Sequence, residues 1–440
     1  MESPHSVDTQ FSVVEPSFSI GQKPAFGAGV RVPFLRPEVG EAEIAEVIDT
    51  LRSGWLTTGP KVKMFEEDFA AAVNGKYAVA VNSCTAALHL AVEALGLSSG
   101  QAVLVPTMTF AATAEIVLYT GAVPILVDCD PETGNIDLDD ARRKVYDIRA
   151  GRLSHIADSN IDIVGIIPVH VGGYMADVGK TREFASEFGL WVVEDAAHAF
   201  PSAWRPDAES PWQMCGDDTA TVTCYSFYAN KTITTGEGGM AVTNNEVIAE
   251  KIRLMSLHGL SRDAWKRYSD CGSWDYRIMA PGYKYNLTDI AAAIGIHQLA
   301  RAEYMRLQRE AVAEIYLERL GQISELELPP TDDNRMHSWH LFPIRLNTTS
   351  LSISRNEFIE ELRLRGVGYS VHWRPLHLHP YYAEKVGWKE HDLPSASRLW
   401  PRLISLPIFP SMLSEEIAHV VEAIGSICTA NSKKRLSLVA

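Results

Sequence analysis

The amino-acid sequence predicts an α/β protein whose large domain is a three-layer sandwich built on a mostly parallel sheet. Between residues 62 and 245, helix-like segments alternate with short and wholly apolar runs. Four of these runs are residues 102–105, 123–127, 163–167 and 191–193. Strands that are apolar on both faces are typical of parallel sheets covered by helices on each side. With 440 residues, the chain also has room for a second and smaller domain.

Apolar periodicity predicts the helices. In residues 85–96, four apolar side chains fall on one helical face, and Gly96 ends the segment. Residues 288–320 predict one long helix, rich in alanine at first and charged later, which links the large domain to a C-terminal one.

The C-terminal part predicts a small α+β domain. Residues 340–346 and 368–373 predict strands, and residues 414–427 predict a last helix. Ser354 and Glu357 form a capping box that opens a helix ending at Arg365. The expected organisation is a tail at 1–30, a large domain at 31–290, a linking helical region at 291–330, the small domain at 331–430 and a tail at 431–440.

Composition narrows the class of protein. The formal net charge of −15 weighs against binding to nucleic acid or to an anionic membrane surface. No apolar run reaches the ~20 residues that a membrane helix needs, and the N-terminus lacks the pattern of a signal peptide. The six cysteines form no CxxC pair and do not lie beside histidine at metal-ligand spacing. We therefore expect a cytoplasmic protein with reduced thiols and no metal centre.

Polar residues follow the apolar runs, and ligands of open α/β sheets bind beyond the carboxyl ends of the strands. These residues are therefore the first candidates for a site: residues 106–110, Asp128, His170, Glu194, Asp195 and Ser226.

Lys231 lies among small and hydroxyl-bearing residues in segment 226–239, between two apolar runs. Taken alone, a lysine there is a strand-connecting loop residue. Partial desolvation would lower its pKa, and a neutral amine can form a Schiff base with a carbonyl group.

Other residues complete a pattern around this lysine. Asp195 ends an apolar strand, where a carboxylate needs a cation such as a protonated pyridine nitrogen, or else caps a loop. Thr85 begins a helix whose N-terminus favours phosphate. Phe110 could stack on a flat ring or fill the core, and Ser226 could bind phosphate or shape a turn. Together these features describe a site for pyridoxal phosphate.

The chain resembles the DegT/DnrJ/EryC1/StrS family of sugar-nucleotide aminotransferases from about residue 32 to residue 427. The resemblance depends on five motifs: residues 53–60, 82–89, 194–198, 226–239 and 281–289. Within this family it is most similar to the UDP-4-amino-4-deoxy-L-arabinose aminotransferases, through residues 258–260, 281–289 and 337–342. The resemblance implies a fold type I pyridoxal phosphate aminotransferase.

The resemblance also implies a role for each matching residue. Lys231 would hold the cofactor and move protons, and Asp195 would pair with the pyridine nitrogen. The remaining cofactor contacts would come from His198, Phe110, Cys84, Thr85 and Ser226, with Asn286 supplied by a neighbouring subunit of a homodimer. Thr58, His340, His372 and His377 would lie near the sugar nucleotide.

The implied reaction moves an amino group from an amino acid, by family analogy L-glutamate, to a keto-sugar nucleotide. Carbon 4 of the sugar is favoured and carbon 3 stays open. One alternative is a sugar dehydratase of the same fold, against which Lys231 argues because that branch has histidine there. Another is a non-catalytic, cofactor-binding regulatory protein. The chain has no GxGxxG turn for a nicotinamide cofactor.

Two segments depart from the family pattern. Phe200-Pro-Ser202 replaces a small glycine-containing turn, and residues 203–218 are longer and richer in Trp and Pro than usual. We expect both to lie near the cofactor edge or the substrate mouth, where they would affect the choice of substrate.

Overall fold

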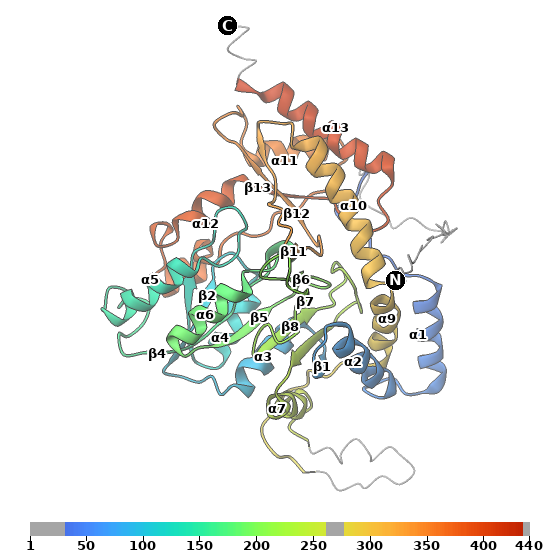
Figure 1. Cartoon of the computed structure of the whole chain (residues 1–440), viewed down its shortest axis with the longest axis vertical. Coiled ribbons are helices and arrows are strands. Elements are labelled where there is room, and N and C mark those ends of the chain that lie inside the picture. Colours follow the sequence, from blue (N-terminus) through green and yellow to red (C-terminus); the bar gives the residue numbers. More distant parts are fainter. Residues whose placement is uncertain (1–30, 261–276, 434–440) are drawn as a thin grey trace, which may run out of the picture.

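The computed structural model describes residues 31–260 and 277–433. The expected tail at 1–30 and the part of the expected C-terminal tail beyond residue 433 lie outside this range, as does Cys271. Within it, the chain forms a large α/β part and a smaller C-terminal part joined by helices α9 and α10 (Figure 1).

The large part is built on a seven-stranded sheet with the order β1-β9-β8-β5-β4-β2-β3. Its strands are β1 Tyr77–Val81, β2 Gln101–Pro106, β3 Val123–Val127, β4 Asp162–Ile166, β5 Trp191–Asp195, β8 Val222–Ser226 and β9 Gly239–Thr243. Only β9 runs antiparallel to its neighbours, β1 and β8. The mostly parallel sheet is therefore confirmed, and each predicted apolar run is one of its strands.

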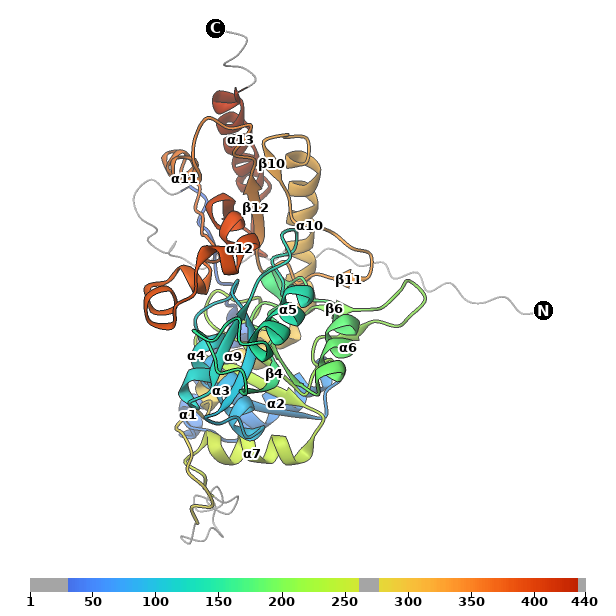
Figure 2. The same ribbon diagram turned by 90° about the vertical axis from the view of Figure 1, so that its left-hand side faces the viewer.

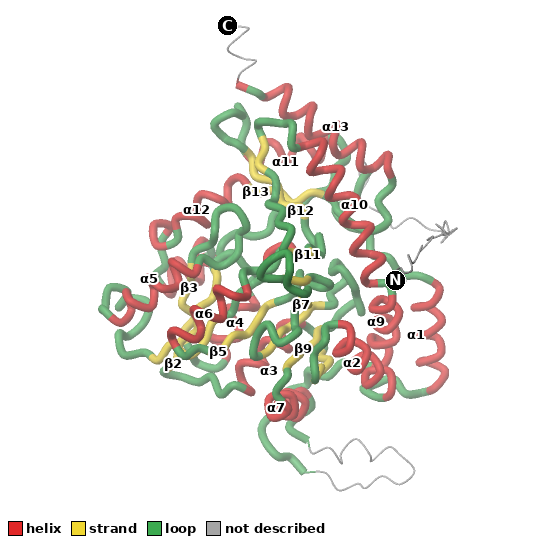
Figure 3. The backbone as a smooth tube through the Cα atoms, viewed as in Figure 1, coloured by secondary structure: helices red, strands yellow, loops and turns green. Residues whose placement is uncertain are grey.

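Helices pack against this sheet (Figure 3). They are α2 Pro60–Ala72, α3 Cys84–Ala94, α4 Ala112–Tyr119, α5 Leu138–Arg149, α6 Val178–Phe188, α7 Glu246–Ser256 and α9 Asp289–Ala300. Helix α1 Glu41–Ser53 packs on the outer side of α9. Alternate residues of β1 enter two different apolar clusters: Val79 and Val81 pack with α3, whereas Ala78 and Ala80 pack with α2 and α9. The sheet is thus buried on both faces, as its apolar strands predict.

The C-terminal part contains a three-stranded antiparallel sheet with the order β10-β12-β13. Its elements are β10 Leu326–Glu327, β12 Phe342–Leu346, β13 Leu403–Leu406, α11 Arg355–Leu364, α12 Pro394–Leu399 and α13 Ser414–Asn431. The expected capping box is present, since the Ser354 hydroxyl accepts from the Glu357 N–H at 3.3 Å and the Glu357 carboxylate accepts from the Ser354 N–H at 2.7 Å. Val32 packs in one apolar cluster with residues of β12, β13, α11 and α13, so this residue belongs to the core of the C-terminal part.

Two predicted elements differ from the structure. The helix expected at residues 288–320 is divided at Arg301 into α9 and α10, Ala302–Leu320. Arg301 leaves helical geometry and binds Glu38 and Glu43, which ties the junction to the segment around α1. Residues 368–373 form no regular strand: Ser370 exchanges two hydrogen bonds with Ser405 of β13, and the pairing ends there.

The remaining elements are short. A third sheet joins β6 Ala203–Trp204, β7 Gln213–Met214 and β11 Arg335–Met336 in the order β11-β6-β7. Short helical turns occupy Val171–Gly173, Leu376–Leu378, Tyr381–Val386, Glu390–Asp392 and Trp400–Arg402. Among the residues that the structure describes, no helix has the length and apolarity of a membrane span.

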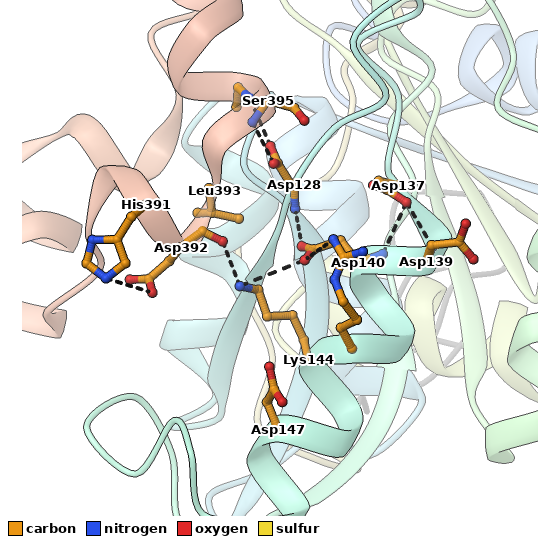
Figure 4. Close-up of polar contacts among 12 residues, drawn as sticks. Asp128, Asp137, Asp139, Asp140, Lys144, Asp147, His391, Asp392, Leu393 and Ser395 are labelled. Carbon is orange, nitrogen blue, oxygen red and sulfur yellow. Dashed lines mark hydrogen bonds and ion pairs between the residues drawn. The ribbon is translucent and has the colours of Figure 1, made fainter.

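Asp128, at the end of β3, fastens the C-terminal part to the large one (Figure 4). Its buried carboxylate accepts hydrogen bonds from the N–H groups of Ser395 at 2.7 Å and Ala396 at 2.8 Å, at the start of α12. Lys144 of α5 donates to the carbonyl of Asp392 at 2.8 Å. The segment that leads from His372 to α12 is therefore held against the carboxyl end of the sheet.

Candidate active site

A cavity of about 440 Å³ opens at the carboxyl end of the central strands. Nine of the twelve residues predicted for the site line it: Cys84, Thr85, Phe110, Asp195, His198, Ser226, Lys231, His340 and His372. They come from both parts of the chain, because the small part contributes His340 and His372. Figure 2 shows the two parts from the side, with β12 of the small part above the large one.

Lys231 follows β8 in a turn, where its N–H donates to the carbonyl of Tyr228 at 2.9 Å. Burial lowers the pKa of its amine to about 8, although Cys84 and Asp195 act in the opposite direction. A lysine with this pKa is neutral for part of the time near neutral pH, which is the condition for attack on a carbonyl carbon.

Asp195 ends β5 and its carboxylate is buried. One oxygen accepts from the hydroxyl of Thr113 at 2.7 Å and the other from the N–H of Ala197 at 3.1 Å. Burial raises the pKa of this carboxyl group, and the two hydrogen bonds partly oppose the shift. No cation of the described residues lies within salt-bridge distance, so the site suits a ligand that brings a positive charge.

The N-terminus of α3 lies at the cavity, with Ser83, Cys84 and Thr85 in its wall. A Cβ atom on Gly239 would lie 2.4 Å from the carbonyl carbon of Ser83, so only glycine lets β9 approach this turn. Free N–H groups and the helix dipole make such a turn a site for phosphate. The thiol of Cys84 points elsewhere, 4.0 Å from Asp195 Oδ1, so this residue could reach a phosphate through its backbone.

Three histidines line the cavity beside Lys231, and burial lowers the pKa of each of them. His198 Nδ1 accepts from the Gly172 N–H at 3.2 Å, which leaves the proton of a neutral ring on Nε2. The rings of His198 and His340 are 4.3 Å apart, and Trp373 stacks on His198 at 5.0 Å. These neutral rings offer hydrogen bonds without adding charge.

Three predicted residues lie outside this cavity. His377 is buried between the large part and α12, where its nitrogens are 2.8 Å from the hydroxyls of Thr107 and Ser397. Both nitrogens are thus already engaged within this chain, and a contact with the sugar nucleotide stays a prediction that this arrangement does not favour. Asn286 donates to the hydroxyl of Thr58 at 2.7 Å, and neither residue lines the cavity of its own chain.

Sequence reasoning missed Thr113 and did not single out Trp373. Thr113 stands four residues after Thr109, a spacing that brings two side chains together at the start of a helix, but threonine is too common at helix starts to be selected on that ground. Trp373 lies in the segment from His372 to His377, which the family resemblance implies is near the sugar nucleotide.

The two unusual segments do not line the cavity. Phe200 packs against Phe69 in the apolar core, with ring centroids 4.7 Å apart. Residues 203–218 form β6 and β7, which pair with β11 away from the lining. Phe200 nevertheless lies close to the site, since its carbonyl accepts a hydrogen bond from the hydroxyl of Thr232, next to Lys231. The expected effect of both segments on the choice of substrate stays a prediction.

One buried group, His170, Glu194 and Cys215, has the composition of a metal site. The N–H of Ala176 donates to His170 Nδ1 at 3.1 Å, so a neutral ring carries its proton on Nε2. This proton faces Glu194 Oε1 at 3.5 Å, while Thr219 and Thr223 donate to the other oxygen. The geometry describes a close contact between His170 and Glu194, in which the two threonines supply the hydrogen bonds to the carboxylate.

Comparison with known proteins agrees with this geometry. The profile of the DegT/DnrJ/EryC1/StrS aminotransferase family matches residues 37–425. The spore coat polysaccharide biosynthesis protein SpsC of Bacillus subtilis is 41% identical over 397 residues, which cover 90% of this chain and 97% of SpsC.

Solved structures show the same similarity. The proposed sugar aminotransferase Spr1654 of Streptococcus pneumoniae, in its PMP form, superposes with a TM-score of 0.79 at 31% identity, covering 91% of this chain and 99% of that one. DesV of Streptomyces venezuelae, in complex with a ketimine intermediate, gives a TM-score of 0.77 at 30% identity with the same coverage. The predicted family, fold type and cofactor are confirmed. The chain belongs to the DegT/DnrJ/EryC1/StrS aminotransferase family and is a pyridoxal phosphate-dependent transaminase.

Proposed function

We propose that this transaminase moves an amino group from an amino acid, with L-glutamate as the first donor to test, to a keto-sugar nucleotide. The observation that carries the proposal is the placement of Lys231 and Asp195 in one cavity with a helix N-terminus. The similarity to SpsC and Spr1654 supports a sugar as the acceptor. The sequence resemblance to the UDP-4-amino-4-deoxy-L-arabinose aminotransferases favours a keto group at carbon 4, with carbon 3 still open.

The residues of the cavity fit pyridoxal phosphate. Lys231 supplies an amine of lowered pKa, and the start of α3 supplies a place for phosphate. Asp195 supplies a buried carboxylate that forms no ion pair with any described residue. When bound, the cofactor supplies an electron sink for the bond that must break at the donor carbon. Asp195 holds the proton of the ring nitrogen, Lys231 moves a proton at the reacting carbon, and Phe110 and His198 would confine the ring.

The first test uses the purified protein and added pyridoxal phosphate. A visible absorbance band should form, and excess L-glutamate should convert it to the band of the pyridoxamine form. Because the pKa of Lys231 is about 8 and the neutral amine reacts, the rate of band formation should rise with pH through that value. A band that ignores amino donors would favour the dehydratase or the non-catalytic protein, and no band would contradict the proposal.

We further propose that the active unit is a homodimer in the cytoplasm. Phe110 and Tyr228 line the cavity but are 65% and 48% exposed, so the site is open on one side in the single chain. Asn286 and Thr58 form a hydrogen-bonded pair outside it. In a twofold dimer, the pair of one subunit can complete the cavity of the other. The five free cysteines of the described residues agree with a reducing compartment.

Mixed dimers test the shared site. Lys231→Ala and Asn286→Ala subunits should each be weak alone, the second through loss of cofactor affinity. Mixing them should restore about a quarter of wild-type activity, because half of the dimers then contain one intact site. Asn286→Ala mixed with a Lys231→Ala, Asn286→Ala double variant is the matched control, because no site can then combine Lys231 with Asn286. If mixing restores nothing although mixed dimers form, Asn286 does not act across the interface.

A further inference from the structure

We propose that Thr113, itself held by Thr109, is a positioning residue that fixes the Asp195 carboxylate in its ionised form. Nothing in the family comparison assigns a role to either threonine. The inference deepens the proposed function because it rests on the role of Asp195 there. Its main test uses the cofactor-free protein, so the two can fail separately.

The geometry is a short chain of hydrogen bonds between three buried side chains. Thr113, in the first turn of α4, lies with its hydroxyl 2.7 Å from Asp195 Oδ2. The hydroxyl of Thr109 is 2.7 Å from that of Thr113. All three residues are 5% exposed or less, so water does not replace these contacts. Of the three, Thr109 and Asp195 line the cavity, whereas Thr113 lies behind them.

Each threonine hydroxyl has a single proton, and this fixes the direction of the two hydrogen bonds. An ionised carboxylate only accepts, so the single hydroxyl proton of Thr113 must point at Asp195. Thr113 then cannot donate to Thr109, and the proton of Thr109 must point at Thr113. Thr109 consequently presents only lone pairs to the cavity while Asp195 is ionised. If Asp195 were protonated, both hydrogen bonds could reverse their direction, and Thr109 would then present its proton to the cavity.

The direction matters because little else stabilises this charge. Lys231, Cys84, Cys224 and His170 face Asp195 from the neighbouring elements, and none of them forms an ion pair with it. Beyond Thr113, the N–H of Ala197 is the one hydrogen-bond donor within 3.5 Å among the described residues, and the thiol of Cys84 lies 4.0 Å from Oδ1. Burial disfavours the ionised form, so each hydrogen bond to it counts.

The test compares Thr113→Val, which removes the hydroxyl at nearly constant volume, with Thr113→Ser, which keeps it. Melting temperatures of the cofactor-free protein are measured at fixed protein concentration across pH. Loss of the donor raises the pKa of folded Asp195 further above its unfolded value. As pH rises from the unfolded pKa of Asp195 through the folded one, the valine variant should therefore lose more stability than wild type. Below the unfolded pKa, the difference in stability between the two proteins should stay constant. Thr113→Ser should follow wild type.

The same pair of substitutions in an Asp195→Asn background isolates the charge. There, the pH-dependent part of the valine effect should vanish, since the amide does not titrate. In the otherwise native protein, Thr113→Val should also weaken the binding of pyridoxal phosphate by about tenfold, as expected for one hydrogen bond to a charged group. If Thr113→Val fails to fold, Thr109→Val should show the same dependence on pH with a smaller loss of stability.

Three results would overturn the proposal. They are a pH-dependent loss that persists with Asn at position 195, a serine variant that behaves like the valine variant, and a valine variant with the pH profile and cofactor affinity of wild type. If wild type itself binds no cofactor, the proposed function fails, but the pH comparison on the free protein still decides the role of Thr113.

Discussion

Replacing Lys231 with alanine should abolish transamination, with a fall in kcat of at least about 10⁴-fold. The variant loses both the amine that attacks the cofactor and the group that moves the proton. It should form no visible band with pyridoxal phosphate. The fold should persist, because Lys231 makes no side-chain hydrogen bond or ion pair within the described part of the chain, apart from electrostatic coupling to Cys84 and Asp195.

Lys231→Arg is the matched control, since it keeps the positive charge but cannot become neutral near pH 7. It should retain phosphate binding, seen as competition by pyridoxal phosphate for a fluorescent analogue, and lack the band. Single-turnover assays with L-glutamate would detect residual chemistry. Turnover by either variant within tenfold of wild type would refute the assignment of Lys231.

Replacing Asp195 with alanine should lower kcat by about 10²- to 10⁴-fold. Breaking one buried ion pair costs about 3–5 kcal/mol, and each 1.36 kcal/mol corresponds to a tenfold change in rate. The loss falls on kcat because the carboxylate stabilises the protonated ring most where charge develops. Retained activity near wild type would show that Asp195 does not pair with the ring nitrogen.

Asp195→Asn separates this electrostatic role from packing. The folded pKa of Asp195 is raised, so its ionised form costs stability, and that cost grows as pH rises from the unfolded pKa through the folded one. The cofactor-free asparagine variant should therefore melt no lower than wild type, with an advantage that grows over this range. If the variant is inactive but more stable, the carboxylate of Asp195 serves activity at a cost in the stability of the fold.

The elements that depend on local pattern could be predicted from the sequence. The apolar runs define strands of the large sheet because strands that are buried on both faces are mostly apolar. The capping box at Ser354 is a contact between neighbours in sequence, so the same two residues form it in the structure. Asp195 stands out because it ends an apolar strand, and Lys231 because it lies among small and hydroxyl-bearing residues without charged neighbours.

Contacts between distant segments could not be predicted in the same way. The helix break at Arg301 follows from its bonds to Glu38 and Glu43, more than 250 residues away. His377 looks like a candidate ligand, but the fold uses both of its nitrogens between two segments. The extra residues 203–218 suggest a change at the substrate mouth, yet their position depends on pairing with β11. Each case was decided by a partner that sequence spacing does not reveal.

The attachment of α12 to Asp128 bears on how binding energy is used. When a mobile segment of a binding site closes around a substrate, it must be ordered at each turnover, and the free energy of this ordering lowers the affinity. Here, two hydrogen bonds to a buried carboxylate, each about 1.5–3 kcal/mol, would have to break before the segment beginning at His372 and Trp373 could swing away. This segment is thus preorganised. The free energy of ordering this segment is therefore not subtracted from the affinity for a ligand.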